Sequence, residues 1–303
     1  MTWLACGASV TGSEHERRGL GCDDAYGYGI VGDFVVAAVA DGAGSVSGTS
    51  AWGSYAACQS ILTDALQPRF VQDFQATPAE HGETLMRWLF DCAAKRVSEH
   101  ADAMRVDVSR LSTTLCVALA GRDHAVFGQI GDGIIATEND GRVETLLIEP
   151  KSDYANSTWF LQSDDAFEES YRTATQLSVT AFALSTDGMS YKITNVATGE
   201  AYEPFFRGSW QHVRSGASAD KFAALLRGIE DDQTGDDKTM VLVASGAKGD
   251  HQAPPSDPTR PIVSCSAPPR GWSVPEPAHP SESATDPLPD EGRRRRLFGR
   301  RRK

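Results

Sequence analysis

The stretch FVVAAVADGAGS (34–45) decides how the rest of the chain is interpreted. Its seven apolar residues (34–40), several of them β-branched, predict a buried strand, and Asp41 with Gly42 predicts a tight turn at its end. An aspartate in this place has two interpretations. It can stabilise its own turn through backbone hydrogen bonds, or it can offer carboxylate oxygens to a hard cation such as Mg²⁺ or Mn²⁺.

Four further acidic turns resemble this one, namely CDDA (22–25), IGDG (130–133), STDGM (185–189) and GDDKT (235–239). IGDG and STDGM directly follow predicted strands, and GDDKT directly precedes one. Each turn alone is most simply a turn, but five in one chain favour a shared site, although spacing cannot show that they converge. Two divalent ions about 4 Å apart could acidify a water between them for attack on phosphorus.

The remaining pattern predicts an α+β fold. Besides residues 34–40, strands are expected at 113–119, 125–130, 143–148, 181–186 and 240–245. Helices are expected at 48–66, 83–104 and 218–230, the second because Leu85, Trp88, Leu89 and Cys92 recur at helical spacing. Because few βαβ units are evident, antiparallel sheets packed with helices are the expected architecture.

Composition divides the chain near residue 249. Eleven of the fifteen prolines lie beyond it, so residues 250–292 are predicted to be a disordered linker between a domain at 1–249 and an Arg-rich tail at 293–303. Residues 250–303 contain ten Lys/Arg and seven Asp/Glu, which leaves a net charge of −15 on residues 1–249. The tail is expected to bind an acidic partner or an anionic surface, and its removal with the linker is expected to leave activity intact.

A cytoplasmic, reduced protein is the expected class. The N-terminus lacks the basic start and apolar core of a secretory signal, and no apolar run approaches the roughly 20 residues that span a bilayer. The six cysteines form no CxxC pair, which favours buried thiols over disulfides or a zinc site.

The order of the motifs resembles the PP2C (PPM) family of metal-dependent serine/threonine protein phosphatases. These motifs are CDDA, VADGAGS, STTLCVAL, GQIGDG, LSTDGM and DDKTMVLV, spread over about residues 5–246. HERRG (15–19) and YANSTWF (154–160) are similar to segments of the compact bacterial branch. The resemblance implies an α-β-β-α sandwich, two antiparallel sheets flanked by helix pairs, with metal ions at one edge.

The resemblance also implies roles for individual residues. Two ions, Mn²⁺ or Mg²⁺, and possibly a third would be held by a set of oxygen donors: Asp24, Asp41 as the bridging and catalytic residue, the Gly42 carbonyl, Asp187, Asp236 and, for the third ion, Asp132. Asp23 would support these ligands without binding metal. Phosphoserine and phosphothreonine esters would be hydrolysed by a metal-bridging hydroxide, in a substrate protein that is expected to be a cognate Ser/Thr kinase or one of its targets.

The chain departs from the family pattern at two places. Ala43 stands where many relatives have a histidine proposed as general acid, so His15 or a metal-bound water would supply that proton. Gly19 stands where the phosphate-binding arginine is usual, so Arg18 or Arg17 would have to substitute. A pseudophosphatase that only binds a phosphorylated partner is the alternative, but the retention of Asp24, Asp41, Asp187 and Asp236 favours activity.

Overall fold

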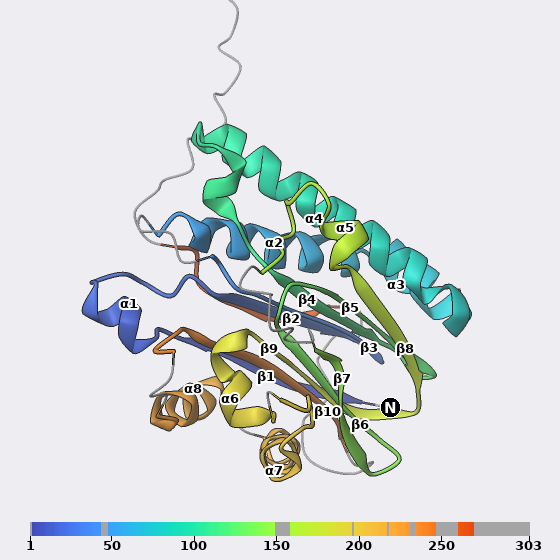
Figure 1. Ribbon diagram of the computed structural model, residues 1–303. Coiled ribbons are helices and arrows are strands. Elements are labelled where there is room, and N and C mark those ends of the chain that lie inside the picture. Colours follow the sequence, from blue (N-terminus) through green and yellow to red (C-terminus); the bar gives the residue numbers. More distant parts are fainter. Residues whose placement is uncertain are drawn as a thin grey trace, which may run out of the picture. The chain divides into compact units, whose positions relative to one another are not determined.

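A computed structural model shows two antiparallel sheets stacked face to face, with helices covering both outer faces (Figure 1). It describes residues 2–43, 48–148, 158–195, 197–216, 218–230, 234–246 and 260–269. This arrangement confirms the predicted α-β-β-α sandwich.

The described strands fall into one sheet of five and one of six. The five-stranded sheet has the spatial order β1 (Trp3–Val10), β10 (Lys238–Ser245), β9 (Val179–Ser185), β6 (Ile134–Asn139) and β7 (Arg142–Ile148). The six-stranded sheet has the order β11 (Ile262–Cys265), β2 (Ala25–Val31), β3 (Phe34–Ala40), β4 (Leu115–Ala120), β5 (His124–Ile130) and β8 (Arg172–Leu177).

Strand β3 shows why the six-stranded sheet is covered on both faces. All seven of its residues are buried. Val36 and Ala38 belong to the apolar cluster beneath the helices. Val35, Ala37 and Val39 belong to the cluster between the two sheets. Because successive side chains of a strand point to opposite faces, a uniformly apolar strand requires a covering layer on each side.

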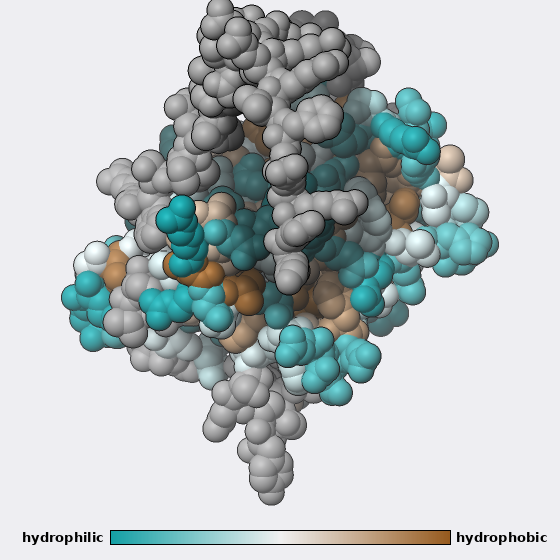
Figure 2. All heavy atoms as spheres, turned by 90° about the horizontal axis from the view of Figure 1, so that it is seen from above, coloured by the Kyte–Doolittle hydropathy of each residue, from teal (hydrophilic) through white to brown (hydrophobic). Residues whose placement is uncertain are grey.

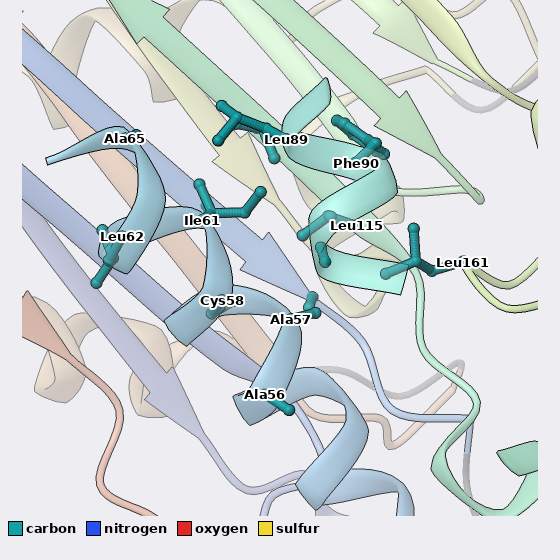
Figure 3. Packing of buried hydrophobic residues seen from close by; sticks show 14 of the residues in the cluster. Ala56, Ala57, Cys58, Ile61, Leu62, Ala65, Leu89, Phe90, Leu115 and Leu161 are labelled. Atoms are coloured by element: carbon teal, nitrogen blue, oxygen red, sulfur yellow. The ribbon is translucent and has the colours of Figure 1, made fainter. Parts of the chain in front are cut away.

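Helices α2 (Ser50–Ala65), α3 (Pro68–Ala76) and α4 (Gly82–Met104) cover the six-stranded sheet. Figure 3 shows Ile61 of α2 and Leu89 and Phe90 of α4 in the cluster that they form with Leu115 of β4. Trp88, on the same predicted face of α4, is 46% exposed and stacks on Phe70 of α3 instead of entering this core.

Helices α7 (Glu203–Arg214) and α8 (Ala219–Gly228) cover the five-stranded sheet, where Phe206, Trp210 and Phe222 are fully buried. Three shorter helices, α1 (Ser13–Arg17), α5 (Ala166–Glu169) and α6 (Ser190–Ile193), lie in connections between strands or other helices. On the face seen in Figure 2, the coloured hydrophilic and apolar side chains are interspersed.

Strand β2, which was not predicted, has glycines in its sequence AYGYGIV. A Cβ at Gly27 would lie 2.6 Å from a methyl carbon of Leu62, and one at Gly29 would lie 2.6 Å from a methyl carbon of Leu66. The glycines therefore let α2 pack directly on the strand, at the expense of the β-branched pattern by which strands are recognised.

Strand β11 corrects the prediction that residues 250–292 form a disordered linker throughout. It pairs with β2 from Ile262↔Ile30 to Cys265↔Gly27, so residues 260–269 belong to the folded body. A strand at the edge of a sheet exposes unpaired N–H and C=O groups, and β11 satisfies those of β2. The rest of the predicted linker, and the Arg-rich tail at 293–303, lie outside the described residues, and the division at 249 stays a prediction for them.

Within the described ranges, no helix combines the length and apolar character needed to cross a membrane. All six cysteines are free thiols; Cys6, Cys58 and Cys116 are buried.

Candidate active site

Strand register brings three of the predicted acidic turns to one end of the six-stranded sheet. The pair Ala25↔Ala40 places Asp24, just before β2, beside Asp41, just after β3. The pair Leu115↔Ile130 brings the end of β5, and therefore the turn with Asp132, to the same end.

The five-stranded sheet contributes the other two turns. The pair Met240↔Ser185 places Asp187, which follows β9, beside Asp236, which precedes β10. The turn with Asp132 joins β5 of one sheet to β6 of the other, because Ile134 pairs with Ser185. The chain therefore crosses between the sheets at the edge where the five turns gather, which we call the acidic edge.

Asp41 lies at the electrostatic centre of this edge. Burial raises the pKa of its carboxyl well above the usual range. Nearby carboxylates raise this pKa further, in decreasing order Asp24, Asp187, Asp236 and Asp132. The other four predicted acids thus lie within electrostatic reach of Asp41, which their spacing in sequence could not show.

Two glycines permit this close approach. A Cβ at Gly42 would lie 2.6 Å from the carbonyl oxygen of Asp23. A Cβ at Gly188 would collide with the carbonyl oxygen of Asp237. A larger residue at either place would push the turn of Asp41 away from Asp23, or that of Asp187 away from Asp236.

Hydroxyl side chains hold the backbone and carboxylates of the acidic edge. The Asp41 N–H donates to Thr114 Oγ1 at 3.0 Å, and the Thr114 N–H donates to the Asp41 carbonyl at 2.9 Å. This reciprocal pair fixes Asp41 at the end of β3. Thr114 lies in the segment 113–119 predicted to be a strand, and the sequence STTLCVAL contains no signal for this contact.

Asp24 and Asp23 are held in the same way. Thr186 Oγ1 donates to Asp24 Oδ2 at 2.7 Å, and Ser50 Oγ donates to Asp23 Oδ2 at 2.7 Å. Burial raises the pKa of both carboxyls; charge from Asp237 raises that of Asp24 further, whereas the hydroxyl contacts lower both. Thr186 directly precedes Asp187 in STDGM. This one turn therefore supplies the Asp187 carboxylate and also the hydroxyl that holds Asp24.

Asp237 is a further residue of the candidate site, one to which the sequence assigns no role. It is 2% exposed, and it accepts hydrogen bonds from Gly12 N at 2.7 Å, from Asp23 N at 2.6 Å and from His15 Nδ1 at 2.9 Å. It therefore ties the start of β10 to α1 and to the turn before β2. Asp237 is the second acid of GDDKT, whereas the resemblance assigns the metal-binding role to the first, Asp236.

His15 is buried, at 6% exposure, and its partner limits its chemistry. A carboxylate oxygen only accepts, so Nδ1 of His15 carries the proton in the bond to Asp237. A neutral His15 then has a lone pair, not a proton, at Nε2. The structure thus shows His15, the predicted general acid, in a hydrogen bond that supports the fold. To donate a proton to the leaving group, the His15 ring would have to carry a proton on both nitrogens.

The predicted phosphate contacts lie on the surface of α1. Arg17 and Arg18 are exposed, and Arg17 forms an ion pair with Glu14 of the same helix. Ala43 offers no titratable group, as expected. Thr158, from the predicted YANSTWF segment, donates to Asp132 Oδ2 at 2.8 Å; residues 154–157 of that segment lie outside the described residues.

The donor set suits a hard divalent cation, since it consists of carboxylates and the Gly42 carbonyl. Crowded carboxylates with raised pKa values are also what a cation would stabilise. Among the residues that the structure describes, however, no three carboxylate, histidine or cysteine side chains are arranged as a finished coordination sphere. The acidic edge therefore gathers the right donors without defining the positions of ions.

Comparison with known proteins agrees with this geometry. A family model described as protein phosphatase 2C matches residues 11–227. The chain is 25% identical over 257 residues to serine/threonine-protein phosphatase 3 of Escherichia coli (strain K12), an alignment that covers 80% of this chain and 98% of that protein.

Solved structures show the same fold. A bacterial serine phosphatase superposes with a TM-score of 0.56 at 14% identity, covering 80% of this chain and 98% of its own. The serine/threonine phosphatase of S. agalactiae superposes with a TM-score of 0.53 at 14% identity, covering 80% of this chain and 99% of its own. At these identities the superpositions support the fold alone, and the family match supports the activity. The chain belongs to the protein phosphatase 2C family and is a serine/threonine protein phosphatase.

Proposed function

We propose that this phosphatase hydrolyses phosphoserine and phosphothreonine esters in proteins and that it requires Mn²⁺ or Mg²⁺ at the acidic edge. One observation supports this proposal above the others. The carboxyl of Asp41 has its pKa raised by burial and by four neighbouring carboxylates. At neutral pH such a cluster is unfavourable unless cations offset its charge.

The ligands that we propose are Asp24, Asp41, the Gly42 carbonyl, Asp187 and Asp236, with Asp132 at a third, weaker site. Bound there, two such ions would acidify a water and polarise the phosphoryl oxygens. Thr114 keeps Asp41 in place, and Thr186 and Ser50 hold Asp24 and Asp23. Asp23 supports the site through the backbone bond to Asp237.

Cysteine chemistry is disfavoured by the thiol nearest to these acids. Cys22 precedes Asp23 and Asp24, and burial raises the pKa of its thiol well above the usual range, with charge from Asp24 and Asp237 raising it further. The thiolate is the nucleophile, and a thiol held protonated among acids does not supply it. A water is therefore the nucleophile that the site supports.

His15 is better placed to organise the site than to donate the leaving-group proton. It holds Asp237, which in turn accepts from the backbone of Gly12 and Asp23. Proton donation by His15 is therefore the weaker alternative to donation by a metal-bound water. A phosphate contact by Arg18 or Arg17 is likewise the weaker part of this proposal. The substrate that we propose is a phosphorylated protein, such as a cognate Ser/Thr kinase or its target; an acidic partner or anionic surface for the tail stays a prediction.

The test uses the full chain and a phosphothreonine peptide. We expect phosphate release with Mn²⁺ and its loss with excess EDTA. Asp41→Asn should abolish release, whereas Asp123→Asn, a matched change in the exposed turn at the opposite end of the β4–β5 hairpin, should not. Full activity in EDTA would refute the metal requirement, and peptide binding without phosphate release would indicate a pseudophosphatase.

A further inference from the structure

Residues 260–269, which we call the strap, end the folded body beside the acidic edge. Strand β11 within the strap pairs with β2 up to Cys265↔Gly27. Ser266 then continues the pairing by two bonds to Tyr26. Its N–H donates to the Tyr26 carbonyl at 2.9 Å, and its Oγ accepts from the Tyr26 N–H at 2.9 Å.

These two bonds lie at the start of β2, close to Asp24 and Asp41. Tyr26 lies two residues after Asp24, and on its other side it pairs with Val39, two residues before Asp41. Without Ser266, the N–H and C=O of Tyr26 on this side would lose both partners. Ser266 therefore fixes the start of the strand from which Asp24 extends into the acidic edge.

Ser266 also lies close to the five-stranded sheet. Its Oγ is 3.4 Å from Ser9 Oγ, and Thr239 Oγ1 donates to Ser9 Oγ at 2.8 Å. Thr239 N donates at 3.2 Å to Thr186 Oγ1, the donor to Asp24. A separation of 3.4 Å is longer than an ordinary O–H···O bond, so Ser266 acts on Asp24 mainly through the Tyr26 backbone and only weakly through these hydroxyls.

The strap also shields Asp24 from one side. A cleft of about 310 Å³ is lined by Asp24, Cys22, Tyr26 and Ser9 on the body and by Cys265 and Ser266 on the strap. Asp24 itself is only 6% exposed. Displacement of the strap would widen this cleft and bring water to a carboxylate that the fold otherwise keeps buried.

We propose that the strap is part of the catalytic scaffold and that Ser266 is a positioning residue, which holds Asp24 through Tyr26 for cation binding. This inference rests on the proposed metal site at the acidic edge. It reverses the expectation that everything beyond residue 249 is dispensable for activity.

The test compares Ser266→Ala with Ser264→Ala in the full chain. Ser264 lies on the same strap, where it pairs with Tyr28 and not with Tyr26. Calorimetric titration of the chelator-treated protein with Mn²⁺ should show about tenfold weaker binding for Ser266→Ala and unchanged binding for Ser264→Ala. Ser266→Thr, which keeps the hydroxyl, should restore the affinity.

Amide exchange of metal-free protein supplies a second measurement that does not depend on Mn²⁺. The Tyr26 amide should exchange faster in Ser266→Ala than in Ser264→Ala, because it has lost its acceptor. Faster exchange with unchanged Mn²⁺ affinity would overturn the inference alone, as would equal losses of affinity in both variants. Absence of Mn²⁺ binding by the wild type would overturn the proposed function, and this inference with it.

Discussion

Two carboxylates at the acidic edge have different surroundings: Asp237 is buried, whereas Asp41 is partly exposed. Asp237 accepts hydrogen bonds from two backbone N–H groups and from His15. Asp41 has the charges of four other aspartates around it, and burial and these charges raise its pKa. Both residues belong to acidic motifs that the sequence alone does not distinguish.

We interpret Asp237 as a carboxylate that stabilises the fold, and we propose that Asp41 takes part in the reaction. A buried acid surrounded by donors stabilises the folded chain as it stands. A carboxylate among other carboxylates is destabilised by their repulsion, and a bound cation would relieve that repulsion.

Asp41→Asn should reduce turnover of a phosphothreonine peptide at least about 100-fold, because it removes the charge on which several kcal/mol of transition-state stabilisation depend. The free energy of unfolding of the metal-free variant should equal or exceed that of the wild type, since repulsion is relieved. Urea titrations and steady-state kinetics measure the two quantities. Near-normal turnover would show that Asp41 has been assigned the wrong role.

Asp237→Ala should act in the opposite sense. It leaves the Gly12 and Asp23 N–H groups without acceptors in a buried place, so the free energy of unfolding should fall by about 2–4 kcal/mol. The same urea titration measures it, with Asp123→Asn as the control. If Asp237→Ala has the same free energy of unfolding as the wild type, Asp237 does not stabilise the fold and does not differ from Asp41 in this respect.

Metal removal should make stability depend on pH in a defined direction. The pKa values of Asp41 and Asp24 are raised in the metal-free fold, so their contribution is fully present below the unfolded value of about 3.9 and is lost as pH rises through the folded values. Melting temperatures in EDTA should therefore fall from pH 5 to pH 8 more steeply in the wild type than in Asp41→Asn.

Mn²⁺ at a hundredfold excess over its dissociation constant should restore about 2.7 kcal/mol to the wild type. The measurement is the same melting series with Mn²⁺ in place of EDTA. Identical melting curves with and without Mn²⁺ would contradict a cation site at the acidic edge.

The smallest effect is expected on α1. Arg18→Ala should raise KM for the phosphopeptide about two- to fivefold, as an exposed charge contact of up to about 1 kcal/mol allows. Arg17→Ala is the matched control, because Arg17 already pairs with Glu14. Equal KM values for both variants and the wild type would show that neither Arg17 nor Arg18 contacts the phosphate.

Much of the fold was predictable because its signals are local. The apolar run at 34–40, the helical spacing around Leu89 and the order of the acidic turns all appear in the covalent chain, and each corresponds to an element of the structure. Strands β1, β2, β6, β8 and β11 were not predicted. Glycines weaken the pattern of β2, and β11 lies among prolines in a segment typical of disorder.

The acids that are available, and their places before or after strands, can be read from the amino-acid sequence. Which of them gather around Asp41, and which accept hydrogen bonds from the backbone, depends on how the two sheets pack. Asp236 and Asp237 are neighbours in one motif, yet it is the Asp237 carboxylate that accepts hydrogen bonds from Gly12, Asp23 and His15. It does so because β1 and β10 lie side by side there, with Val10 paired to Lys238. The pairing of the strap with β2 also depends on the tertiary structure, because the unpaired edge of β2 exists only once the sheet has formed.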